Sequence, residues 1–131
     1  MGVLDLSRSS AFYERLGWTR AGISTSDMVV LSTPASAVLV LHKLDDLLAS
    51  ARMRETPSGF GGVVLGVVVG SLEAVHTTLA KAVDAGATVL RPVTQLGYGS
   101  HAFFADPDGH VWEVIETPGL QLGEGGAVSV P

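Results

Sequence analysis

Apolar residues follow two spacings along this chain, one typical of helices and one typical of strands. In two segments they recur every three or four positions, and each segment begins near an aspartate or serine and ends at a glycine. These features predict two amphipathic helices, over residues 5–17 and 71–86. Runs rich in valine and leucine lie between and after them and predict strands. We expect the strands at residues 27–33, 36–44, 63–69, 88–95, 100–106 and 110–116. A further short helix or ordered loop is expected at 44–53.

The predicted elements occur twice in the same order, which suggests an internal repeat of about sixty residues. A segment rich in Pro, Ser and Gly at 55–62 separates the halves, and residues 119–131 form a Gly-rich tail. We therefore expect one domain over residues 1–118, with modules at about 1–55 and 62–118.

The first strand of the first module is expected to be cut short. The first helix begins so near Met1 that only residues 2–4 remain for a strand before it. Such a strand leaves an unpaired sheet edge, which proteins avoid. Three remedies are open: a true start further upstream, the strand-like sequence AVSV at 127–130, or a partner chain.

Composition excludes several functions. The 131 residues carry a formal net charge of −5 and no cluster of Lys and Arg, so nucleic acid is not expected as a partner. There is no cysteine, which excludes disulfides, thiolate metal ligands and a cysteine nucleophile, and which fits a reducing cytoplasm. No apolar run approaches the roughly 18 to 20 residues of a membrane helix, and the N-terminus lacks the pattern of a secretion signal. We expect a cytoplasmic protein without membrane contact.

One carboxylate stands out because it lies in the middle of an apolar strand. Residues 103–119, FFADPDGHVWEVIETPG, form a predicted hairpin around a turn at 106–109. Strand alternation turns Val111, Glu113 and Ile115 to one face. A buried, unpaired carboxylate costs several kcal/mol, so Glu113 needs a donor, a ligand or a proton unless it is solvated at a rim.

Two stretches of the sequence resemble a known family. SSAFYERLGW at 9–18 is similar to the opening helix, and FFADPDGHVWEV at 103–114 to the closing hairpin, of the vicinal oxygen chelate superfamily. This superfamily contains glyoxalases, bleomycin resistance proteins and extradiol dioxygenases. The resemblance implies an α+β fold of two βαβββ modules that form an incomplete mixed β-barrel with flanking helices around a pocket. It also implies a homodimer.

The resemblance bears on metal binding. Enzymes of the family bind one divalent metal through a His from the first strand and a Glu from the last strand of each module. Glu113 occupies the Glu position of the second module, whereas Val40 occupies that of the first. The second module has no His in its first strand, and the first module's His would lie upstream of Met1. One ligand in four remains, so we predict no resident metal. The alternative is a Zn, Ni, Mn or Fe site that joins His101 or His42 to Glu113.

Other residues are candidates for the pocket. His101 and Phe103 share a face of the strand that partners Glu113, although His101 is equally compatible with a surface position at a strand end. His42 shares a face with Val40 near the expected pocket mouth. Tyr98, in a Gly-flanked loop at 95–100 that we expect to be mobile, and Phe60 are aromatic walls or core cover. Two further histidines, His110 and His76, are expected to be structural, His110 through hydrogen bonding within its hairpin.

These patterns support one leading hypothesis and two others. The leading one is a homodimeric protein that binds or sequesters a hydrophobic or aromatic small molecule without metal, with Glu113 as a ligand-contacting group or base. The alternative is a metal-dependent lyase, isomerase or dioxygenase that uses Glu113 with His101 or His42. The third is an interaction module whose apolar surface serves assembly alone.

Overall fold

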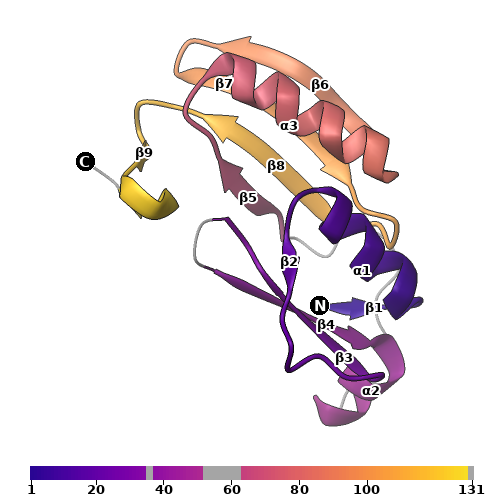
Figure 1. The fold of residues 1–131 in the computed structure, drawn as a ribbon. Helices are drawn as coiled ribbons and strands as arrows, with labels where there is room; N and C mark the ends of the chain where they lie inside the picture. The colour runs from indigo at the N-terminus through magenta and orange to yellow at the C-terminus, as the bar shows by residue number, and fades with distance from the viewer. Residues whose placement is uncertain (35–36, 52–62, 130–131) are drawn as a thin grey trace.

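The computed structural model describes residues 1–34, 37–51 and 63–129, and contains two four-stranded sheets with helices packed on them (Figure 1). The first module comprises β1 (Gly2–Val3), α1 (Leu6–Arg15), β2 (Thr19–Arg20), β3 (Met28–Ser32), β4 (Val38–Lys43) and α2 (Leu44–Ser50). The second comprises β5 (Leu65–Val68), α3 (Leu72–Ala85), β6 (Thr88–Leu96), β7 (Gly99–Ala105) and β8 (Val111–Glu116). A C-terminal segment follows, with β9 (Gln121–Leu122), a 3₁₀ turn at Glu124–Gly126 and β10 (Val128–Ser129).

The two sheets have the same topology, which confirms the predicted repeat. Their strand orders are β1-β4-β3-β2 and β5-β8-β7-β6. In each sheet the first strand of the module runs parallel to the last, and the remaining pairs are antiparallel. Both modules are therefore of the βαβββ type. Within the described residues the two sheets do not close into a barrel.

The first strand is short, as the sequence predicts. β1 has two residues against four in β5, and pairs Gly2 with His42 and Val3 with Lys43. Helix α2 packs against β1 and β4. The tail does not supply a strand here: β10 pairs with β9, with Val128 opposite Leu122, in a separate two-stranded sheet. The alternative in which the C-terminal tail fills the edge of the first sheet is therefore wrong for the described residues, which end at 129.

The helix ends follow the capping signals of the sequence. The Asp5 side chain accepts a hydrogen bond from the Arg8 backbone N–H at 2.9 Å, and Ser71 accepts one from the Ala74 N–H at 3.1 Å. Gly86 ends α3 with a φ of 111°, a left-handed conformation that glycine adopts without a Cβ clash. Among the described residues, no helix has the length and apolar character required to cross a membrane.

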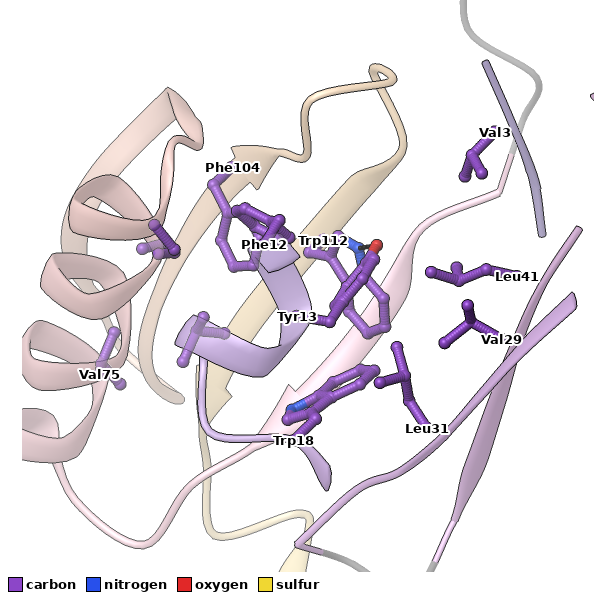
Figure 2. Close-up of a cluster of buried hydrophobic side chains, with 14 residues drawn as sticks. Val3, Phe12, Tyr13, Trp18, Val29, Leu31, Leu41, Val75, Phe104 and Trp112 are labelled. Atoms are coloured by element: carbon purple, nitrogen blue, oxygen red, sulfur yellow. Dashed lines mark hydrogen bonds between the residues drawn. The ribbon is translucent and has the colours of Figure 1, made fainter. Parts of the chain in front are cut away.

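A single hydrophobic core joins the two modules (Figure 2). Helix α1 contributes Phe12 and Tyr13, and the Tyr13 ring lies 5.9 Å from that of Trp112 on β8. Trp112 thus packs on the helix side of its sheet, as alternation predicts. The first sheet contributes Val29 and Leu31 to the same cluster. The first helix therefore packs on the second module as well as on its own.

The turn between β7 and β8 anchors the N-terminal segment. Asp106 accepts hydrogen bonds from the Tyr13 hydroxyl at 2.6 Å and from the backbone N–H groups of Asp108 and His110. Asp108 accepts from the Leu4 N–H, from Arg8 and from the Ser9 hydroxyl. His110 Nε2 lies 2.9 Å from the Gly2 carbonyl, which only accepts, so Nε2 carries the proton. The His110 side chain therefore ties the turn to β1, whereas hydrogen bonding within its own hairpin was expected from the sequence.

Candidate functional site

The candidate site lies on the face of β7 and β8 that points away from the core. Phe103 is opposite Glu113 across the two strands, and His101 is opposite Ile115. The alternating residues of β8, Trp112 and Val114, are buried on the other face. Strand periodicity therefore explains how one strand carries both core residues and a carboxylate.

His101 and Glu113 form a close pair on this face. His101 Nδ1 lies 3.0 Å from Glu113 Oε1, and the two side chains are 7% and 25% exposed. The Phe103 ring meets the imidazole nearly edge-on, with ring centroids 5.0 Å apart at 75°. Because a carboxylate accepts, the Nδ1–H group of His101 donates a hydrogen bond to Glu113 and keeps its proton. Three predicted residues of the second module, His101, Phe103 and Glu113, thus come together.

The second imidazole nitrogen of His101 is the unusual feature of this pair. Nε2 is buried and has no hydrogen-bond partner among the residues that the structure describes. A buried polar atom without a partner costs about 1–3 kcal/mol, and native proteins rarely leave one. With the proton held on Nδ1, Nε2 presents a lone pair that accepts a hydrogen bond or a proton.

The strand on the other side of β8 leaves Glu113 space. Gly66 of β5 pairs with Glu113 in the parallel register, so both lie on the same face of the sheet. A Cβ added at Gly66 would meet no heavy atom within 4 Å. Sequence reasoning did not select Gly66, because its role depends on the β5–β8 register. Glu113 thus has room on the β5 side for a group that is not part of its own module.

The first-module candidates occupy the other four-stranded sheet. Val40 and His42 lie on one face of β4, as predicted, and pair with Val30 and Met28 of β3. Both side chains are half-buried. They belong to a different sheet from Glu113, so pairing in a sheet does not bring them to the His101–Glu113 pair.

The loop expected at 95–100 is a tight turn instead. β6 ends at Leu96 and β7 begins at Gly99, so only two residues connect them. The Tyr98 side chain is 62% exposed, and its carbonyl accepts a hydrogen bond from the Thr117 hydroxyl at 2.6 Å. Gly99 has a φ of +143°, and a Cβ there would lie 2.1 Å from the Glu116 carbonyl oxygen. Glycine at this position permits the close packing against the end of β8, and the expected mobility stays a prediction. Phe60 lies outside the described residues.

The described residues do not fit a metal ion held by one chain. They contain no group of three or more His, Asp or Glu side chains arranged to hold a metal. His101 and Glu113 are hydrogen-bonded to each other, and His42 lies in the other sheet. A site for a divalent ion of this donor class uses at least three protein ligands.

Comparison with known proteins assigns the family. The model of the Glyoxalase/Bleomycin resistance protein/Dioxygenase superfamily matches residues 1–114, so the chain belongs to that superfamily. No curated protein matches the chain significantly.

Solved structures share the fold across nearly the whole chain. A glyoxalase-related enzyme from Fulvimarina pelagi is 28% identical with a TM-score of 0.87, over 98% of this chain and 92% of that one. A glyoxalase/bleomycin resistance protein/dioxygenase family enzyme from Burkholderia phytofirmans PsJN is 24% identical with a TM-score of 0.77, over 89% and 94%. A lactoylglutathione lyase from Agrobacterium tumefaciens is 16% identical with a TM-score of 0.66, over 88% of each chain.

Proposed function

We propose that this protein binds a hydrophobic or aromatic small molecule on the β7–β8 face, without a resident metal ion, and that Glu113 and His101 contact the molecule. The observation that supports this proposal is the hydrogen-bonded His101–Glu113 pair, in which His101 Nε2 is buried without a partner among the described residues. A ligand hydroxyl or amine that donates to Nε2 would satisfy that atom. Phe103 and Ile115, beside the pair, offer apolar surface to the rest of the molecule.

The same pair has the arrangement of a general base. Nε2 accepts a proton from the ligand, and Glu113 holds Nδ1–H and stabilises the imidazolium that results. Binding by itself sequesters the compound. If the ligand has an acidic proton near Nε2, His101 removes that proton and activates the ligand. The same two residues then serve as the binding site and the base.

A thermal-shift screen tests the proposal. The untagged protein is melted with a panel of aromatic compounds that carry a hydroxyl or amine, and separately with EDTA, Zn, Ni, Mn and Fe(II). A ligand at about 100 times its Kd stabilises the native state by about 2.7 kcal/mol, a shift on the order of 10 °C for a small domain. We expect a compound to produce such a shift in EDTA and Glu113→Gln to abolish it.

Glu116→Gln is the matched control. Glu116 lies on the same strand but has the opposite parity, so it points to the other face. The control variant should keep the full ligand shift. A shift that appears only with metal, together with stoichiometric metal by elemental mass spectrometry that Glu113→Gln removes, would establish the metal-dependent lyase, isomerase or dioxygenase instead. A panel that never shifts the melting temperature would favour the interaction module.

The proposal includes a cytoplasmic homodimer. The absence of cysteine fits a reducing compartment. Apolar side chains remain exposed on both modules, among them Leu4 before α1 and Leu90 on β6. A second copy of the chain that covers such residues would remove apolar area from water.

A further inference from the structure

A cavity lies against β5, the edge strand of the second sheet, and residues on both faces of that strand line it. Its volume is about 510 Å³ and most of its wall is apolar. Phe104 and Trp112 form part of the wall with nearly parallel rings, their centroids 6.4 Å apart. Trp18 meets Trp112 edge-on at 5.4 Å. The chain has two tryptophans, and both line this cavity.

The cavity lies where the two modules meet the C-terminal segment. Leu39 of β4 contributes from the first module, and Leu65 and Val67 of β5 from the second. Leu122 and Val128 of the β9–β10 pair cover it in part, and 40% and 48% of these two residues remain exposed. In Figure 1 this C-terminal segment lies beside the end of β5. An apolar occupant would therefore cover side chains that water now contacts.

Among the described residues that line the cavity, Lys81 of α3 is the only charged one. Thr78 precedes it by three residues and so lies on the same face of the helix. Lys81 forms no ion pair with any described residue. The long side chain of a lysine packs its methylene groups along an apolar wall and keeps its ammonium in water. The cavity therefore combines an apolar interior with a cation at its rim.

We propose that this cavity binds an amphipathic anion, with its apolar body between the modules beneath the C-terminal segment and its carboxylate at Lys81. The volume falls within the roughly 300–1,000 Å³ of pockets that enclose small molecules. The apolar wall excludes a strongly polar ligand. The unpaired ammonium selects an anion over a neutral or cationic compound, because a charge-assisted hydrogen bond to Lys81 is stronger than a neutral one. Neither Glu113 nor His101 lines this cavity, although Gly66, which pairs with Glu113, does.

Decanoate is a suitable probe, with 1-decanol as its neutral counterpart. Each is titrated into the full chain below its aggregation concentration, and binding is followed by calorimetry and by tryptophan fluorescence. We expect decanoate to bind, to change the tryptophan emission because both tryptophans line the cavity, and to bind more tightly than 1-decanol.

Two substitutions locate the site. Lys81→Met keeps an apolar stem and removes the charge, and should weaken decanoate about fivefold or more while 1-decanol is unchanged. Lys43→Met is the matched control, since Lys43 is exposed, pairs with Asp27 and does not line the cavity. Ala37→Trp, at an exposed position on the rim, should weaken both compounds by filling the entrance.

The outcomes separate this site from the Glu113 site. Glu113→Gln should leave decanoate binding unchanged. The proposal fails if decanoate does not bind. That result is expected if a second copy of the chain fills the cavity. It also fails if Lys81→Met binds decanoate as well as Lys43→Met does, or if Ala37→Trp has no effect on either compound.

Discussion

Among single side chains, Tyr13 connects the first helix to the second module most directly. Its hydroxyl donates to Asp106 at 2.6 Å and accepts from Trp112 Nε1 at 3.1 Å. Tyr13→Phe leaves both buried partners short of one hydrogen bond, so we expect a loss of about 1–3 kcal/mol in unfolding free energy at pH 7. Chemical denaturation measures the loss. Tyr98→Phe, at an exposed turn, should change it by less than about 0.5 kcal/mol.

The same residue makes stability depend on alkaline pH. Burial, and then the negative charge of Asp106, raise the pKa of Tyr13 above its usual value of 10.0. The folded state thus holds the phenol proton more tightly than the unfolded state does. This contribution is complete below pH 10 and is lost as pH rises from there toward the folded pKa. The decline between pH 9 and pH 11 should be shallower in Tyr13→Phe, and equal slopes would contradict the assignment.

Period-two alternation was enough to put His101 and Phe103 on one face of their strand, because a strand offers its side chains only two faces. That Glu113 lies on the same face of the sheet follows from the β7–β8 register. The hydrogen bond between His101 and Glu113 is a different matter. It depends on the register that pairs His101 with Ile115, which the Asp106–Gly109 turn sets. The relation of His42 to Glu113 depends on how two separate sheets are placed. No local pattern in the sequence carries that information.

Among the strands and turns, the β6–β7 connection shows how a tertiary contact overrides a local signal. Two glycines around an exposed tyrosine are typical of a mobile loop, yet Gly99 packs against the backbone of the β8 end. Gly99→Ala would place a methyl group 2.1 Å from the Glu116 carbonyl oxygen and would strain a φ of +143°. We expect a loss of about 2 kcal/mol or more, measured by denaturant titration.

Gly97 provides the control for this turn. A Cβ at Gly97 meets no atom within 4 Å, so Gly97→Ala should cost less than about 1 kcal/mol. The ordering of the two variants distinguishes a packed turn from a flexible one. A mobile loop would tolerate both substitutions equally, and equal losses would therefore support the expectation that the sequence alone favoured.

For the whole chain, we expect the C-terminal segment to contribute to decanoate binding but little to the stability of the fold. β9 and β10 pair with each other and with neither four-stranded sheet, and the core cluster draws no residue from the segment. The chain shortened to residues 1–118 should therefore unfold in one cooperative step, within a few °C of the full chain, and keep the mass of the proposed dimer by light scattering. It should bind decanoate more weakly, because Leu122 and Val128 no longer cover the cavity. A shortened chain that loses its dimer mass would make the segment part of the subunit interface, and one that binds decanoate as tightly as the full chain would show that the segment does not cover the site.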